Sequence, residues 1–256
     1  MRVGIVGCGA IGNDLAKFAS NQPEISSILL FDQDANRAEH LARTLQKTKV
    51  ARSGDVLVKD SDLIIECASQ DAARLFLPLA VNAGRSVMCL SMGVFADDKF
   101  RLALVDSARK NKVKIYLPSG AIAAVDALKA GALGRISSVT LVTTKPPAAL
   151  GVKADKWTIV FDGTAREAVR KFPLNVNVAA CLALAGVGFD QTRVQVVADP
   201  LATRNQHKVI IEGDFGRIRT EVENLPSPAN PKTSYLAILS AMATLRRILD
   251  PVQLSA

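Results

Sequence analysis

The feature that most constrains the fold of this 256-residue chain is a glycine-rich turn directly after an apolar N-terminal run. Gly7, Gly9 and Gly12 have the spacing G-x-G-x-x-G, with Ala10 and Ile11 between the last two glycines. In this pattern the first glycine permits a tight turn out of a strand, the second lets the backbone approach a pyrophosphate, and the third lets the following helix pack on the sheet. Free N–H groups at the start of that helix would bind the phosphates. All five residues are therefore candidates for cofactor binding.

The residues after the turn agree with this interpretation. A helix is expected over 13–20, followed by an apolar strand over 28–31 that ends in Asp32. An acid about 20 residues after the last glycine would accept hydrogen bonds from the adenosine ribose and repel a 2′-phosphate. The cofactor is therefore expected to be NAD, with NADP as an alternative because Arg37 follows closely. The competing interpretation is a glycine turn in some other parallel sheet.

The N-terminal half of the chain alternates apolar, strand-like runs with helical patterns. The expected elements after Asp32 are helices over 35–46, 71–83 and 97–111 and strands over 62–68, 86–90 and 113–117. This alternation predicts a Rossmann domain, in which right-handed helical crossovers join parallel strands. Ligands of such sheets bind beyond the carboxyl ends of the strands, so polar and small residues there are predicted to face the cofactor. They are Ala68, Ser69, Ser91 and Ser119.

The chain changes character near residue 118, where we expect a domain boundary. Longer strand-like runs follow, over 136–144, 157–161, 192–198 and 207–212, with fewer helices between them. This pattern predicts an α+β domain with a mixed sheet, used for substrate binding or dimerisation. The expected fold class is thus α/β, with a dinucleotide-binding domain over 1–118, a catalytic domain over 119–231, and a helix over 232–250 that packs back on the first domain.

Composition and charge narrow the class of protein. With 49% hydrophobic and 22% charged residues, the chain has the composition of a folded soluble protein. Its net charge of +8 is spread without a basic block, which favours an anionic cofactor and substrate over nucleic acid. Four dispersed cysteines and two histidines do not have metal-ligand spacing, so no metal is expected. No leader and no apolar run near about 18 residues is present, so we expect a cytoplasmic protein without membrane contact.

The two histidines differ in their surroundings. His40 lies among polar residues on a helix that is expected to be exposed. His207 lies where a polar loop enters a strand of the second domain, from which a side chain can face a cleft. A dehydrogenase commonly uses a group that exchanges a proton near neutral pH, so His207 is the candidate. The alternative is a hydrogen-bonded structural histidine.

A proline-rich segment near the C-terminus adds a second candidate. Residues 226–234 are expected to form a rigid loop that delivers a helix over 234–249. Lys232 would lie beside the N-terminus of that helix, which together could bind a carboxylate. The alternative is a surface lysine in a linker.

Several short blocks over nearly the whole chain resemble the L-aspartate dehydrogenases. The blocks are GCGAIG (7–12), ECASQ (66–70), SMG (91–93), PSGAI (118–122), TKPP (144–147), KFPLNVNVAA (171–180), NQH (205–207), GDFG (213–216) and NPKTS (230–234). The later blocks are far more specific than the glycine turn, which many dehydrogenases share. One departure is the Ala123-Ala124 pair, which stands where glycines are expected.

The resemblance implies NAD(P)-dependent oxidation of L-aspartate to iminoaspartate. This product either hydrolyses to oxaloacetate and ammonia or feeds quinolinate and NAD synthesis. The resemblance maps the proton-transfer histidine of the family onto His207, and its cofactor contacts in the second domain onto Ala121 and Asn177. It also implies a homodimer.

The chemistry of this reaction assigns further roles. Hydride leaves Cα for the nicotinamide, so His207 would accept the ammonium proton or activate the hydrolytic water. The two substrate carboxylates need cationic or N–H partners, for which Lys145 and Lys232 are candidates. Two alternatives stay open: a reductase of another carboxylated imine, similar to dihydrodipicolinate reductase, and an NAD-binding regulator without turnover. The physiological direction also stays open.

Overall fold

The computed structural model describes residues 1–172, 177–228 and 230–252, which form two compact units. Unit 1 contains Met1–Pro118 and Ala241–Val252, and unit 2 contains Ser119–Ser240. The division therefore lies inside the C-terminal helix α10 (Tyr235–Leu249).

The C-terminal segment differs from the expectation that all of 232–250 joins the first domain. Within this segment, where a loop was expected, two short strands pair: β12 (Pro226–Ser227) and β13 (Asn230–Ser234). The first turns of α10 belong to unit 2, where Ser240 Oγ accepts the Gly120 N–H at 3.0 Å. Only the last turns join unit 1, because Ala241 and Leu245 are buried in its core.

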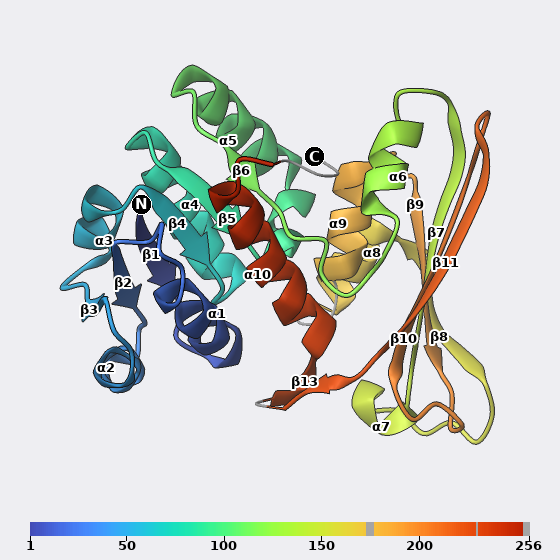
Figure 1. The fold of residues 1–256 in the computed structure, drawn as a ribbon. Coiled ribbons are helices and arrows are strands. Elements are labelled where there is room, and N and C mark those ends of the chain that lie inside the picture. Colours follow the sequence, from blue (N-terminus) through green and yellow to red (C-terminus); the bar gives the residue numbers. More distant parts are fainter. Residues whose placement is uncertain (173–176, 229, 253–256) are drawn as a thin grey trace. The chain divides into compact units, whose positions relative to one another are not determined.

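Unit 1 is a six-stranded parallel sheet in the order β3-β2-β1-β4-β5-β6 (Figure 1). Its strands are β1 (Arg2–Val6), β2 (Ser27–Phe31), β3 (Thr48–Val50), β4 (Leu63–Glu66), β5 (Ser86–Cys89) and β6 (Ile115–Tyr116). The chain leaves β1 in one direction toward β3 and then returns past β1 to β4, so the strand order reverses between β1 and β4. Such a reversal is the place where doubly wound sheets bind ligands. The predicted Rossmann domain is confirmed.

Helices connect the strands of unit 1. They are α1 (Ala10–Ser20), α2 (Ala35–Thr44), α3 (Gly54–Asp60), α4 (Gln70–Asn82) and α5 (Asp98–Lys110), with a short 3₁₀ helix, η1 (Met92–Ala96). Strands β1 and β4 are almost entirely apolar because helices cover both faces of a parallel sheet. The short elements β3 and α3 had no clear pattern in the sequence.

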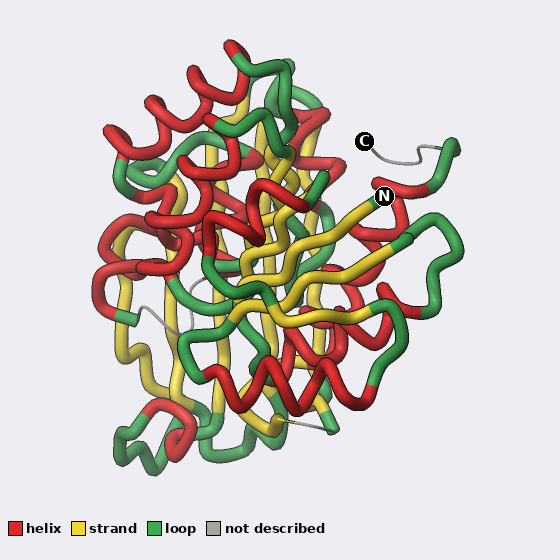
Figure 2. Tube along the Cα trace, turned by 90° about the vertical axis from the view of Figure 1, so that its left-hand side faces the viewer, coloured by secondary structure: helices red, strands yellow, loops and turns green. Residues whose placement is uncertain are grey.

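Unit 2 is a five-stranded mixed sheet in the order β11-β10-β7-β9-β8, and its long strands are visible in Figure 2. The strands are β7 (Ile136–Lys145), β8 (Thr158–Thr164), β9 (Thr192–Ala198), β10 (Asn205–Gly213) and β11 (Gly216–Asn224). Only the β7–β9 pair is parallel, so the predicted mixed sheet is confirmed.

Helices lie on one face of this second sheet (Figure 1). They are α6 (Val125–Gly131), α8 (Ala165–Lys171) and α9 (Asn177–Ala185), while α7 (Pro147–Leu150) is a single turn after β7. Strands β7 and β10 alternate buried and half-buried residues, so one side chain in two faces the helices. This alternation decides which polar residues of the strands are buried.

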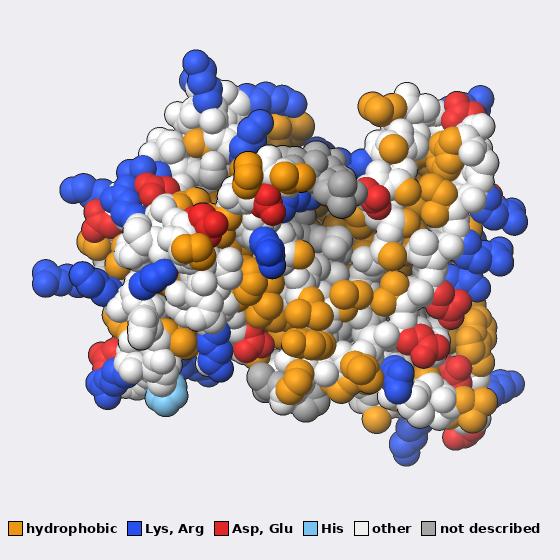
Figure 3. All heavy atoms as spheres, viewed as in Figure 1, with side chains coloured by type: hydrophobic (Ala, Val, Ile, Leu, Met, Phe, Trp, Pro, Cys, Tyr) orange, Lys and Arg blue, Asp and Glu red, His pale blue; other side chains and the backbone are white. Residues whose placement is uncertain are grey.

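Basic and acidic side chains are interspersed over the face of the molecule drawn in Figure 3. Among the described residues, no helix combines the length and the apolar character that a membrane span requires. Over the same part of the chain, no group of three or more His, Cys, Asp or Glu side chains could hold a metal ion.

Candidate active site

The glycine turn after β1 is shaped by close contacts with the backbone. Gly7 has φ +99°, and a Cβ there would lie 2.9 Å from the Ala68 Cβ. A Cβ on Gly12 would lie 1.9 Å from the Gly7 carbonyl oxygen, whereas a Cβ on Gly9 would meet open space. Gly7 and Gly12 are therefore required by the turn itself. The open side of Gly9 is where a ligand can approach the backbone.

Helix α1 begins differently from the other long helices of unit 1. Asp34, Ser53, Ser69 and Asp97 each accept a backbone N–H at the start of α2, α3, α4 and α5. Helix α1 starts at Gly9 without any side-chain cap. The N–H groups of its first turn, which includes Ala10 and Ile11, can therefore bind an anion.

A cavity of about 560 Å³ opens beside this turn, and this volume lies within the usual range for small-molecule sites. Its lining includes five residues singled out from the sequence as cofactor contacts: Gly7, Gly9, Asp32, Ala68 and Ser69. Asp32 Oδ2 accepts the Cys8 N–H at 2.7 Å, and Asp32 Oδ1 accepts the Asp34 N–H at 2.9 Å. Each carboxylate oxygen retains a further lone pair that can accept a ribose hydroxyl.

Arg37 lines the same cavity and forms an ion pair with Asp34 at 3.4 Å. Both side chains of this pair are exposed, Arg37 by 61%, so Arg37 can exchange Asp34 for an anionic ligand at little cost. The uncapped helix, the open Gly9 and the anchored carboxylate together fit the phosphates and ribose of a dinucleotide.

Glu66, at the end of β4, organises this region but was not singled out from the sequence. It is 0% exposed, and its Oε1 accepts the N–H groups of Ala68 at 2.9 Å and Ser69 at 3.0 Å. The Ser91 hydroxyl donates to the same oxygen at 2.9 Å, and the Ser91 N–H donates to Oε2 at 3.2 Å. Burial raises the pKa of Glu66, and these hydrogen bonds oppose that shift. The one available signal was an acid inside an apolar run, a residue type that is seldom fully buried without partners.

Ser91 is oriented differently from the sequence-based expectation. It is 9% exposed, its hydroxyl points to Glu66, and it is absent from the described lining of the large cavity. Ser69 lines the cavity, and its hydroxyl also caps α4 by accepting the Ala72 N–H.

A second polar cluster lies on the helix-covered face of the sheet in unit 2. His207 on β10 is directly opposite Thr143 on β7, and the atoms His207 Nδ1 and Thr143 Oγ1 are 3.0 Å apart. Both residues are 5% exposed, and Lys145, two residues farther along β7 on the same face, is 7% exposed. The fold therefore brings together His207 and Lys145, which the sequence analysis selected separately.

Burial controls the charge of this cluster. Burial, with a smaller contribution from the positive charge of Lys145, lowers the pKa of His207 to about 4. The pKa of Lys145 is itself lowered by burial. His207 is consequently a neutral imidazole at pH 7 and has a vacant site for one proton.

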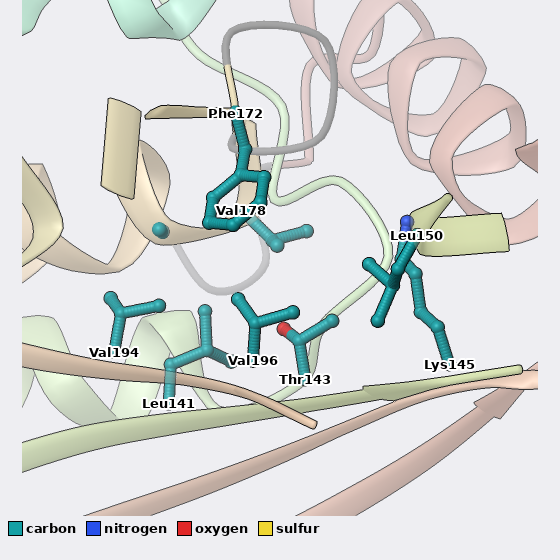
Figure 4. Close-up of a pocket in the computed structure, with 9 residues that line it drawn as sticks. Leu141, Thr143, Lys145, Leu150, Phe172, Val178, Val194 and Val196 are labelled. Atoms are coloured by element: carbon teal, nitrogen blue, oxygen red, sulfur yellow. The ribbon is translucent and has the colours of Figure 1, made fainter. Parts of the chain in front are cut away.

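A small cavity of about 20 Å³ adjoins the cluster (Figure 4). The side chains of Thr143 and Lys145 project from β7 on one side of the cavity, and those of Phe172 and Val178 lie on the opposite side. Asn177, a predicted cofactor contact, is half-buried beside Val178 at the start of α9.

The turn around Ala121 is fixed by hydrogen bonds inside unit 2. Ala121 is 3% exposed, and its carbonyl accepts the Asn224 side-chain amide at 3.3 Å. Ala124 stands where the resemblance leads us to expect glycine, yet it has φ +68° at the start of α6. The turn thus keeps a left-handed residue despite the Cβ, at a cost of about 1 kcal/mol.

Some predicted features lie outside the described part of the structure. The side chain of Lys232 on β13 is one of them, and residues 173–176 of the KFPLNVNVAA block are another.

Comparisons with known proteins agree with this two-unit arrangement. The family model described as "Aspartate dehydrogenase, C-terminal" matches residues 126–248, and that described as "Homoserine dehydrogenase, NAD binding domain" matches residues 7–118. The L-aspartate dehydrogenases of Methanosarcina acetivorans and Methanosarcina mazei are 48% and 47% identical to this chain, over 99% of each chain.

Solved structures show the same similarity. The crystal structure of aspartate dehydrogenase from Thermotoga maritima superposes with a TM-score of 0.82 at 27% identity, over 99% of both chains. A hyperthermophilic archaeal homoserine dehydrogenase in complex with NADPH superposes with a TM-score of 0.60 at 14% identity, over 98% of both chains, and so shares the fold alone.

Proposed function

Because this chain belongs to the L-aspartate dehydrogenase family, we propose that it oxidises L-aspartate to iminoaspartate with NAD(P) as the hydride acceptor. Water then hydrolyses iminoaspartate to oxaloacetate and ammonia, and the same site can run the reverse reductive amination. The observation that carries the proposal is the buried His207–Thr143–Lys145 cluster, in a chain that matches these dehydrogenases along its whole length.

Unit 1 supplies the cofactor site in this proposal. The backbone of Gly7 and Gly9 and the first N–H groups of α1 bind the pyrophosphate, and Asp32 accepts the ribose hydroxyls. When bound, the nicotinamide takes up the hydride from Cα of the substrate. Asp32 favours NAD because a 2′-phosphate would lie beside its charge, whereas Arg37 offers that phosphate a partner.

His207 is the proton-transfer residue in this proposal. Its imidazole lone pair can take a proton from the substrate ammonium, and a substrate carboxylate bound at Lys145 would offset the positive charge that helps to lower the pKa of His207. Loss of the proton leaves the amine lone pair free to stabilise the developing C=N bond. The same nitrogen can later activate the water that attacks the imine. Ala121 and Asn177 complete the cofactor contacts, as the family resemblance implies.

Lys145 is proposed to bind one substrate carboxylate. Burial makes its charge costly, and a carboxylate partner would compensate for that cost. Lys232 stays our candidate for the second carboxylate.

We further propose a cytoplasmic homodimer whose product can also feed NAD synthesis. A reducing compartment is supported by four free cysteines, and the dimer by the family resemblance.

The test is an absorbance assay for the reduced nicotinamide with purified protein, NAD or NADP, and a panel of L-amino acids. Oxaloacetate with ammonia is supplied for the reverse direction. We expect turnover with L-aspartate alone and a larger kcat/KM with NAD than with NADP. Activity only with another carboxylated imine would favour the reductase alternative. Cofactor binding without any turnover would favour a regulator.

A further inference from the structure

The contact between Thr143 and His207 carries information about which ring nitrogen of His207 bears hydrogen. A neutral imidazole has one N–H, and Nδ1 and Nε2 can each carry it. The Thr143 hydroxyl can either accept from Nδ1–H or donate to an unprotonated Nδ1. These two arrangements leave Nε2 in opposite states, because Nε2 has a lone pair in the first and a hydrogen in the second.

We propose that Thr143 is a positioning residue whose hydroxyl oxygen accepts Nδ1–H of His207 and thereby keeps the Nε2 lone pair available as the proton acceptor. The inference rests on the proposed role of His207 in aspartate oxidation. In the proton transfer, an N–H bond of the substrate ammonium breaks, its electron pair stays on the amine nitrogen, and the proton bonds to Nε2. Nδ1 keeps its hydrogen throughout.

The energetic argument favours this arrangement over its opposite. If the hydroxyl accepts, the same hydrogen bond is present before and after Nε2 gains a proton, and it strengthens when the ring becomes cationic. If the hydroxyl donated, Nε2 would already carry hydrogen and could not accept the substrate proton. Protonation of Nδ1 would then break the hydrogen bond in a buried site, where an unmade bond is costly.

The local structure gives Thr143 a fixed geometry for this role. It lies on β7, which is paired on one side with β10 and on the other with β9, so its backbone position is fixed from both sides. Its β-branched side chain has few accessible rotamers, and it is almost fully buried. The Thr143 Oγ1 atom therefore approaches the ring from one fixed direction.

The positive charge of Lys145 increases the need for the Thr143 hydroxyl as a hydrogen-bond partner of His207. Its positive charge disfavours the imidazolium that forms when His207 takes up a proton. A hydroxyl oxygen that accepts Nδ1–H acts in the opposite sense, because its partial negative charge stabilises that cation.

The tautomer can be measured directly because the chain has only two histidines. In a His40→Asn background, protein labelled with ¹⁵N-histidine gives signals from His207 alone. We expect the Nδ1 signal of a protonated nitrogen and the Nε2 signal of an unprotonated one at pH 7. The opposite assignment would overturn the proposal whatever the activity.

Three variants test the consequence for catalysis. Thr143→Val removes the hydroxyl and keeps the shape, Thr143→Ser keeps the hydroxyl, and Thr140→Val changes a threonine on the opposite face of the same strand. We expect Thr143→Val to lower kcat for L-aspartate about 10- to 100-fold with the KM for NAD within about twofold, and to show both tautomers in the nitrogen spectrum. Thr143→Ser should restore most of kcat, and Thr140→Val should match the parent.

The variants also distinguish an error about Thr143 from an error about His207. A parental kcat in Thr143→Val, or no recovery in Thr143→Ser, would overturn the role of Thr143. His207→Ala should lower kcat about 100- to 10,000-fold, and an unchanged kcat there would instead contradict the proposed function of His207. Circular dichroism and NAD binding of each variant verify that the fold is retained.

Discussion

The surroundings of a side chain, more than its identity, decide what the two histidines can do. His40 is exposed on α2, in a helix whose outer face is polar. His207 is buried beside a hydroxyl and a lysine, and its pKa falls to about 4. The same imidazole is thus an exposed surface group at one position and a buried neutral ring at the other.

This pKa predicts how stability depends on pH. In the unfolded chain the pKa of His207 returns to about 6.5, so between pH 6.5 and pH 4 the unfolded state binds a proton that the folded state does not. Acidification therefore favours unfolding, and the loss between pH 7 and pH 5 is about 2 kcal/mol from this residue. Urea unfolding at both pH values measures it.

His207→Gln is the reference for that measurement, because glutamine does not titrate. We expect the free energy of unfolding to fall less in this variant between pH 7 and pH 5, by about 2 kcal/mol. An identical fall in both proteins would mean that His207 is protonated in the folded state or is less buried than described.

At the scale of elements, the end of β4 controls the turn that lines the large cavity. Glu66 receives hydrogen bonds from the turn after β4 and from Ser91 after β5, so one buried carboxylate joins two neighbouring loops. All of these partners are donors, which a carboxylate satisfies with its two oxygens. The shape of the large cavity at Ala68 and Ser69 thus depends on the buried Glu66.

Glu66→Gln should weaken cofactor binding with little effect on the chemical step. The amide replaces one acceptor oxygen by an NH₂ group, so at least one of the N–H or O–H groups that donate to Glu66 loses its acceptor. We expect the KM for NAD to rise about tenfold, which corresponds to the loss of one buried hydrogen bond. Steady-state kinetics with varied NAD measure this change.

The matched control is Glu39→Gln, which alters an exposed acid on α2 that pairs with Arg43. Its KM for NAD should equal that of the parent. If the folded Glu66→Gln variant also keeps the parental KM, the two turns hold their shape without the carboxylate.

At the scale of the whole molecule, the two candidate sites lie in different units. Unit 1 has the cavity beside the glycine turn, and unit 2 has the histidine cluster on the helix-covered face of its sheet. The opposite face of that sheet has no helix over it in the described part of unit 2 (Figure 1). Half-buried Val142 and Ile210 lie on this uncovered face.

This uncovered face is our candidate contact surface for the proposed dimer. Light scattering coupled to size-exclusion chromatography should give twice the 27.2 kDa mass of one chain. Ile210→Glu should shift the mass toward one chain, because a new charge at a position covered by a partner chain is costly to bury. Leu133→Glu, at a position 93% exposed, should leave the dimer intact. A parent protein with the mass of one chain would contradict the dimer.

The sequence by itself determined the features that depend on local backbone geometry and on periodic patterns. Gly7 and Gly12 are required because a Cβ would collide with nearby backbone or side-chain atoms, and the alternation of strands and helices fixed the Rossmann domain and the mixed sheet. Asp32 could be placed from the sequence because it directly follows the apolar strand that ends at Phe31. The family resemblance rests on short blocks of this kind.

Only the tertiary structure decided which distant side chains meet and what charge they carry. His207 and Thr143 are 64 positions apart, and Glu66 and Ser91 are 25 apart, so their contacts depend on strand register and sheet order. The orientation of Ser91 toward Glu66 follows from that contact. The neutral state of His207 likewise comes from burial and a neighbouring charge, which arise only when the chain folds and water is excluded.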